Sequence, residues 1–369
     1  MKRAGVAAAV CAVLSSPVWA QSNVTLYGIV DLGLSRDSGV PVAGTTNKKN
    51  RLGADSGIQS NSRFGLRGTE DLGNGLKATF VFETGLNPDV GGLNNNGATG
   101  GAGFGRETTV GLSGGFGGFK VGRQLSNQYI LLAGTDPFAG GLAGRFNNFA
   151  QVDTRFSNFL LYATPSFGGF TGTFGYAANG LIDEVANGLP AGANSRNARV
   201  AEVGGTYANG PLLAGFDWHS VRNGTNPPAA GGATSRSHLS VAARYDFGPV
   251  ALHGFVTRTR NDAWVSGAKA TDWLLGVSVP VAKGKLLASY IRRDENQFGG
   301  NQDANQWALG YTYPLSKRTN LYTAVARINN RNAAKTAYDN GASGYYSVGN
   351  NTASGLGNQQ INLGLRHTF

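Results

Sequence analysis

Apolar and polar residues alternate along short segments of the chain. In the segment 62–69, Arg63 and Arg67 fall on one face, whereas Phe64 and Leu66 fall on the other. A period of two residues is typical of a β-strand with one face buried and one face wet. The pattern therefore predicts strands rather than amphipathic helices.

The same unit of strand, tight turn, strand and longer loop recurs along the chain. We expect hairpins at 62–83, 106–123, 155–176, 200–220, 240–259, 272–291 and 306–328, an opening strand at 24–34 and a closing strand at 359–369. The long connections are 35–59, 85–105, 125–154, 177–199, 221–237, 260–271, 292–304 and 329–358. A tilted membrane strand needs about 9–11 residues, and long loops facing short turns are typical of outer-membrane barrels. The pattern predicts an all-β fold, a transmembrane antiparallel β-barrel of about 16 strands.

Two other all-β folds fit the sequence less well. A soluble β-sandwich of this length would normally divide into domains, and the chain shows no linker. A secreted β-solenoid would show a fixed short repeat, and none is visible. Beyond residue 20 no apolar run approaches the 18 residues of a membrane helix, so entry into a membrane would require a barrel.

The first twenty residues have the composition of a secretory signal peptide. Lys2 and Arg3 are basic, residues 4–14 are apolar, and small residues precede a cleavage site near Ala20. The alternative is a buried first helix. We expect residues 1–20 to be removed on export and residues 21–369 to form one barrel domain. Cys11, the only cysteine, lies in the signal peptide. Because cleavage removes it, the mature protein is expected to have no disulfides and no thiolate metal sites.

The charge balance is basic but dispersed. The formal net charge of +11 becomes +9 once Lys2 and Arg3 are removed, and no run of Lys and Arg exceeds two residues. Nucleic-acid binding needs a concentrated basic footprint. The dispersion therefore argues against a nucleic-acid partner.

Four segments carry a resemblance to a known family. VTLYG at 24–28, SRFGLRGTEDLGNG at 62–75, VGRQ at 121–124 and GLRHTF at 364–369 resemble the general diffusion porins of Gram-negative bacterial outer membranes. The resemblance implies a homotrimer of sixteen-stranded barrels in the outer-membrane lipid, each with a water-filled channel for passive diffusion of small hydrophilic solutes and ions. It also implies that the third long loop, 125–154, folds into the pore.

The resemblance further implies a constriction with charges of both signs. The segment 133–141 resembles the acidic part of the third loop, although Phe138 and Ala139 stand where the family often has a second acid; Asp153 is another candidate at the loop's end. Alternation independently places Arg63 on the wet face, because charge on the lipid face is costly. The expected constriction consists of a basic wall, Arg63, Arg67, Arg106 and Arg155, and an acidic side, Asp136 and Glu83. These charges predict a mild preference for anions, unless other loop acids cancel the arginines.

The sequence gives little support to enzyme chemistry. His219, His238, His253 and His367 are scattered, without HExxH spacing, and no GxSxG motif occurs. Alternation within strands explains His219 near Asp217 better than a catalytic role does. We expect no catalytic residue, no metal site and no cofactor.

Two function classes stay open, a general porin and a substrate-selective channel for sugars or phosphate. A sugar channel would display a run of aromatic residues, and Tyr129, Phe138 and Phe146 in the third loop are few. Phe369 closes an alternating strand and resembles the address read by the barrel-assembly machinery. The same residue is expected to seal against the first strand.

Overall fold

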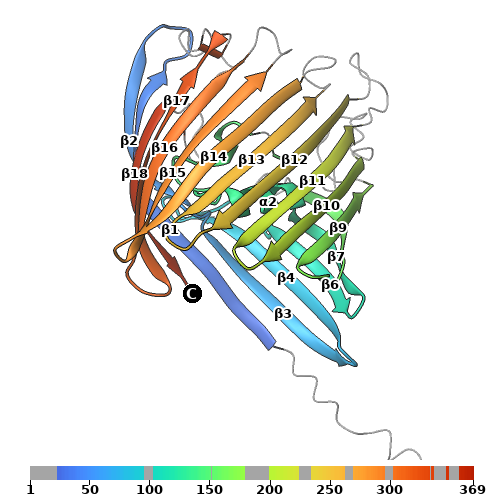
Figure 1. Cartoon of the computed structure of the whole chain (residues 1–369). Coiled ribbons are helices and arrows are strands. Elements are labelled where there is room, and N and C mark those ends of the chain that lie inside the picture. The colour runs from blue at the N-terminus through green and yellow to red at the C-terminus, as the bar shows by residue number, and fades with distance from the viewer. Residues whose placement is uncertain are drawn as a thin grey trace, which may run out of the picture.

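The chain forms a closed antiparallel barrel (Figure 1). The computed structural model describes residues 23–94, 103–150, 152–178, 199–223, 234–261, 269–295, 302–332, 334–335, 346–348 and 357–369. Of the eighteen strands in these residues, β2 (Lys48–Ser56) and β5 (Gly92–Asn94) belong to loops, which leaves sixteen in the wall. This confirms the predicted fold class. The wall strands are β1 (Asn23–Pro41), β3 (Arg63–Gly73), β4 (Leu76–Asn87), β6 (Glu107–Gly114), β7 (Gly117–Leu125), β8 (Arg155–Ala163), β9 (Phe170–Ala177), β10 (Arg199–Asn209), β11 (Leu212–Asn223), β12 (Thr234–Asp246), β13 (Ala251–Asn261), β14 (Lys269–Val281), β15 (Gly284–Glu295), β16 (Ala304–Pro314), β17 (Thr319–Asn330) and β18 (Gln359–Thr368).

The first strand closes the barrel by changing partners along its length. Its beginning, Asn23–Ile29, pairs with β3, and its middle, Ile29–Ser38, pairs with β18. Beyond the last ladder pair, Gly28 and Phe369 exchange two backbone hydrogen bonds of 3.2 and 3.1 Å. The seam between the first and last strands is thus hydrogen-bonded from Gly28 to Ser38, which closes the barrel as a membrane requires. The expected seal of Phe369 against the first strand is present.

Side chains alternate between the two faces of the wall as the sequence predicts. On β18, Ile361, Leu363 and Leu365 are exposed on the outer surface, whereas Asn362 is buried inside. Leu365 is paired with Leu32 of β1, which is also exposed, so the register keeps apolar residues of both strands on one face. A continuous apolar outer surface suits a lipid environment.

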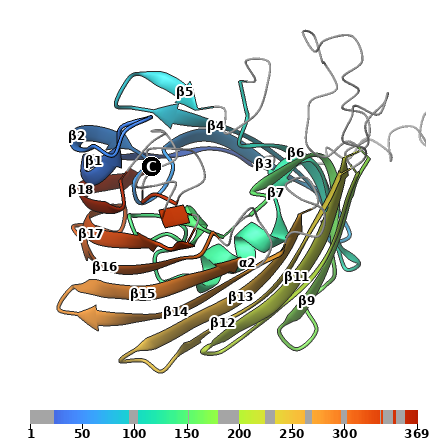
Figure 2. The ribbon, with the colours of Figure 1, turned by 90° about the horizontal axis from the view of Figure 1, so that it is seen from above.

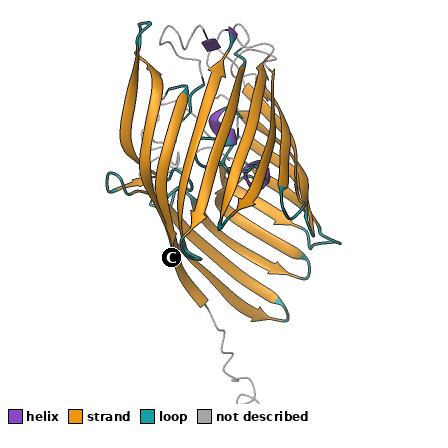
Figure 3. Ribbon diagram, turned by 60° about the vertical axis from the view of Figure 1, so that its left-hand side comes forward, coloured by secondary structure: helices purple, strands orange, loops and turns teal. Residues whose placement is uncertain are grey.

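Short turns join the strands at one end of the barrel (Figure 3). The turn between β3 and β4 consists of Asn74 and Gly75 alone, both with positive φ, 52° and 78°. Two such residues form the type I′ turn that matches strand twist. The turn therefore has two residues, whereas the sequence predicted a six-residue turn at 70–75, and β3 is correspondingly longer.

The third loop lies inside the barrel (Figure 2). It contains helix α2 (Asn127–Thr135) and a 3₁₀ turn, Phe146–Asn148. Ser126 caps the helix by accepting a 3.1 Å bond from the Tyr129 N–H. None of the helices in the described residues is long and apolar enough to cross a membrane.

The hydrophobic core lies between the third loop and the inner wall, not at the centre of the barrel. Leu132, Phe138 and Phe146 of the loop are buried with Phe255 and Leu274 of the wall. Phe146 meets Phe255 edge to face, with ring centroids 6.0 Å apart. This packing holds the loop against β12 to β17.

Candidate functional site: the channel constriction

Three of the four predicted wall arginines form one charged group with Glu83. The Arg106 Nε donates a 2.7 Å bond to Glu83 Oε1, and an Nη1 of Arg63 lies 3.8 Å from the same oxygen. Arg155 joins the group through a 2.7 Å bond from its Nε to the Arg106 carbonyl oxygen. Strands β3, β4 and β8 and the residue that precedes β6 therefore bring these side chains together.

Glu83 lies within the basic wall, not across the channel from it as expected. Its strand, β4, pairs directly with β3, so Glu83 faces the same side as Arg63. Its second oxygen accepts a 3.0 Å bond from the Tyr27 hydroxyl. Glu83 thus compensates part of the arginine charge at close range.

Arg67 faces the lumen four residues beyond Arg63 along β3, toward the short turn. Its guanidinium lies over the Tyr27 ring, 5.1 Å from the centroid, a cation–π contact. The structure therefore places Arg67 beside the group formed by Arg63, Arg106 and Arg155.

Asp136 also lies elsewhere than expected. Its side chain is buried inside the third loop, where the carboxylate accepts backbone N–H bonds from Phe138, Gly140 and Phe146 at 3.2, 2.9 and 3.4 Å. Burial raises the pKa of Asp136 to about 7 despite these three donors. The residue shapes the loop and does not present a free carboxylate to the arginines.

A cavity of about 290 Å³ lies between the third loop and the basic wall. Arg145 and Tyr129 line it from the loop, and Arg155, Ser62 and Asn87 line it from the opposite side. The described residues around it include no Asp or Glu. A small solute at this point meets guanidinium, hydroxyl and amide groups.

Arg145 was missed by the sequence reasoning, as was Arg123. Burial lowers the pKa of Arg145 to about 10, so the side chain stays cationic at neutral pH. Its Nε donates a 3.1 Å bond to Asn148 Oδ1. Arg123 donates to the Gly105 carbonyl oxygen at 2.6 Å and lies in the VGRQ segment. The resemblance of the VGRQ segment to the family could have pointed to Arg123, whereas no periodic pattern in the sequence marks Arg145.

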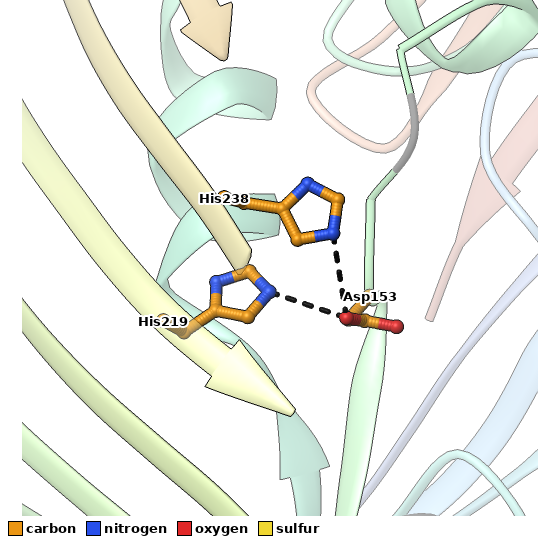
Figure 4. A group of neighbouring side chains, drawn as sticks. All are labelled: Asp153, His219 and His238. Carbon is orange, nitrogen blue, oxygen red and sulfur yellow. Dashed lines mark hydrogen bonds and ion pairs between the residues drawn. The ribbon is translucent and has the colours of Figure 1, made fainter. Parts of the chain in front are cut away.

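The far end of the third loop is fixed by a second charged cluster (Figure 4). Asp153 accepts bonds from Arg236 Nε at 2.9 Å and Nη2 at 2.5 Å, and lies 3.2 Å from His219 Nε2. Burial alone would raise the pKa of Asp153, but the bonds to His219 and Arg236 hold it well below its ordinary value. Asp153 is therefore an ionised acid that is already paired.

A closed barrel narrowed by an infolded loop with charged groups at the narrowing defines a membrane channel. The sequence profile of the Gram-negative porins matches residues 7–333. The chain belongs to this family. It lies in the bacterial outer membrane and forms a channel for passive diffusion of small hydrophilic solutes.

Individual relatives match over nearly the full length. Outer membrane porin protein 32 of Delftia acidovorans is 34% identical, with all of both chains covered. An outer membrane porin of Bordetella pertussis is 32% identical over 87% of this chain and 93% of its own. The solved structure titled an anion-selective porin from Comamonas acidovorans has a TM-score of 0.76 and 31% identity, covering 95% of this chain and all of its own.

Proposed function

We propose that the channel prefers anions, as the sequence predicts, and that Arg145 and Arg155 are its main selectivity residues. The observation that carries the proposal is the cavity that both guanidinium groups line, without an acidic residue among its described lining. Arginine stays charged at neutral pH even when it is largely buried. Charges of one sign at a narrow point of a channel attract ions of the opposite sign and repel ions of the same sign.

The acidic residues near the constriction do not cancel the positive charge of Arg145 and Arg155. Glu83 is shared by Arg63 and Arg106, so that group keeps a net positive charge. Asp136 turns its carboxylate to backbone N–H groups. Asp153 is neutralised locally by Arg236. The relative from Comamonas acidovorans whose title states anion selectivity supports the same direction.

The cavity favours a general porin over a channel selective for sugars. Tyr129 is the single aromatic residue among the described residues that line it, whereas the remaining side chains are hydroxyl, amide or cationic groups, with Leu86 as the exception. Sugars are usually guided by stacked aromatic rings. The channel performs no covalent chemistry in this proposal and is not an enzyme.

The assembly and export of the chain follow from the family resemblance. We infer a homotrimer in outer-membrane lipid, made from residues 21–369 after removal of residues 1–20, which lie outside the described residues. The strand ending at Phe369 would be read by the barrel-assembly machinery. Amino-terminal sequencing and the molar mass of the detergent-solubilised protein test cleavage and trimerisation.

The reversal potential of the channel in a planar bilayer tests the selectivity. Under a KCl gradient we expect a potential of the sign set by chloride, with linear current at low voltage. A potential of the sign set by potassium would contradict the proposal. Added sugar or phosphate distinguishes the alternative, because a substrate-selective channel would show block of the current by its own solute.

A further inference from the structure

Asp153, His219 and His238 bring three possible metal ligands to one point (Figure 4). The Nε2 atoms of His219 and His238 lie 3.2 and 3.7 Å from Asp153 Oδ2, and the three ligand atoms lie within 4.8 Å of one another. Ligands bonded to zinc at about 2.0–2.1 Å in a tetrahedron are separated by about 3.4 Å. Both distances to Asp153 therefore fit a tetrahedral site.

Both imidazole rings are oriented by a second partner. The Nδ1 of His219 lies 3.0 Å from Asp217 Oδ1, and the Nδ1 of His238 lies 3.1 Å from Thr259 Oγ1. A hydrogen bond at Nδ1 fixes the ring and leaves Nε2 for a metal, the arrangement common to histidine ligands in proteins. Here both Nε2 atoms point toward the same carboxylate, and an ion would replace the 3.2 Å contact of His219 Nε2 with Asp153 Oδ2.

The barrel wall holds the histidines rigidly. His219 of β11 and His238 of β12 are direct partners in the ladder and are stacked, with ring centroids 4.7 Å apart. Their side chains are 0% and 1% exposed, whereas that of Asp153 is 15% exposed. The two histidines are thus held in place by the wall, and Asp153 is the ligand that is partly exposed to solvent.

Arg236 donates hydrogen bonds to Asp153 without using all the acceptor sites of the carboxylate. A carboxylate has about four lone-pair sites, and Arg236 uses one on each oxygen. Oδ2 retains a site for an ion that replaces the contact with His219. The arginine lowers the net negative charge and weakens the affinity relative to an isolated acid.

We propose that Asp153, His219 and His238 bind a divalent transition-metal ion of the zinc class, with water as the fourth ligand. Imidazole with carboxylate suits Zn²⁺, Co²⁺ and Ni²⁺ better than Mg²⁺ or Ca²⁺. The bound ion fastens the end of the third loop to β11 and β12. The proposal does not depend on the anion preference proposed above, because none of the three ligands lines the cavity of Arg145 and Arg155.

The test uses the detergent-solubilised protein after chelator treatment. Titration with ZnCl₂ in a calorimeter is expected to show one ion per chain, and CoCl₂ is expected to give the visible absorption of a tetrahedral centre. Asp153→Asn and His238→Gln each remove a ligand and should weaken binding at least tenfold. Thr259→Val removes only the partner of His238 and should weaken it about tenfold.

His367→Gln is the matched control, because His367 is exposed and pairs only with Thr319 in the described residues. Each variant is scored only if it migrates as a folded barrel on unheated gels. The absence of a stoichiometric ion in the wild-type protein would overturn the proposal. Equal affinity in wild type and His238→Gln would overturn it too, because the ion would then lie elsewhere.

Discussion

At the scale of single residues, two guanidinium groups line one cavity at the constriction. Arg145 comes from the third loop and Arg155 from the wall. We expect Arg145→Gln or Arg155→Gln to lower the chloride-to-potassium permeability ratio, and the double variant to lower it further. An ion 4 Å from a charge in water interacts by about 1 kcal/mol, a factor of about five per arginine. Reversal potentials under a KCl gradient measure the ratio.

The matched control is Arg318→Gln, in the exposed turn before β17. It removes one positive charge at the end of the barrel without changing the constriction. An unchanged ratio in Arg155→Gln, or an equal decrease in Arg318→Gln, would show that the overall charge governs selectivity and not the cavity.

The buried carboxyl of Asp136 predicts a pH dependence of the third loop. The folded group titrates near pH 7, whereas an unfolded aspartate titrates near pH 3.9. The packed loop therefore binds more protons than the opened loop between these values, and its stability decreases as the pH rises from about 4 to 7. Hydrogen exchange of residues 127–150, corrected for intrinsic rates, should show more frequent opening at pH 8 than at pH 5.

Asp136→Asn serves as the comparison, since an amide does not titrate. Its loop opening should be the same at both pH values after correction. Slower opening of the wild-type loop at pH 8 than at pH 5 would mean that the carboxylate is favoured by its three N–H donors over the neutral acid.

At the scale of elements, missing side chains on the wall make room for the third loop. Gly276 of β14 lies under Pro137, and a Cβ at this position would come within 2.7 Å of the proline Cγ. We expect Gly276→Ala to push the loop into the lumen and lower the single-channel conductance. Overpacking of this kind costs about 1–3 kcal/mol. Planar-bilayer recordings measure the conductance.

Gly254→Ala provides the control on the neighbouring strand β13. A Cβ there meets the Leu274 carbonyl oxygen at 3.4 Å and the Leu275 side chain at 3.7 Å, which are ordinary contacts. Its conductance should equal that of the wild type. A normal conductance in Gly276→Ala would show that the loop yields without narrowing the channel.

The elements differ in how well the sequence predicts them. Wall strands are predicted because lipid and water impose an alternation that extends over each strand. Helix α2 was not predicted, although its buried residues Gln128, Leu131, Leu132 and Thr135 have helical spacing. Nine residues inside a loop give too short a pattern for periodicity to decide.

At the scale of the whole molecule, the position of each charge depends on contacts between distant segments. Arg145 lines the cavity because the loop is held by bonds such as Gln306 Nε2 to the Gly144 carbonyl oxygen, 162 residues apart. Glu83 pairs with Arg106 because β4 pairs with β6. Alternation gives the face of a side chain, but not its partner across the barrel. His219 and His238 became neighbours only through the ladder between β11 and β12.

Closure of the barrel depends on the contact between its first and last strands. A Cβ on Gly28 would lie 2.3 Å from Phe369 Cζ and 2.7 Å from the Arg63 carbonyl oxygen. Because that oxygen belongs to the wall ladder, relief would require movement of β3 or β1. We expect Gly28→Ala to destabilise the closed barrel by about 1–3 kcal/mol and to lower the yield of folded protein on dilution from urea into detergent.

The folded fraction is measured by the difference in gel migration between heated and unheated samples at successive times. Gly115→Ala is the control, because a Cβ there meets nothing within 4 Å in the turn between β6 and β7. Wild-type protein and this control should fold to the same extent, and Gly28→Ala should fold less. Since all sixteen wall strands close through one seam, a defect at Gly28 should reduce the number of active channels without changing the conductance of each. A lower conductance with a normal folded yield would contradict this, because the substitution would then act on the lumen and not on closure.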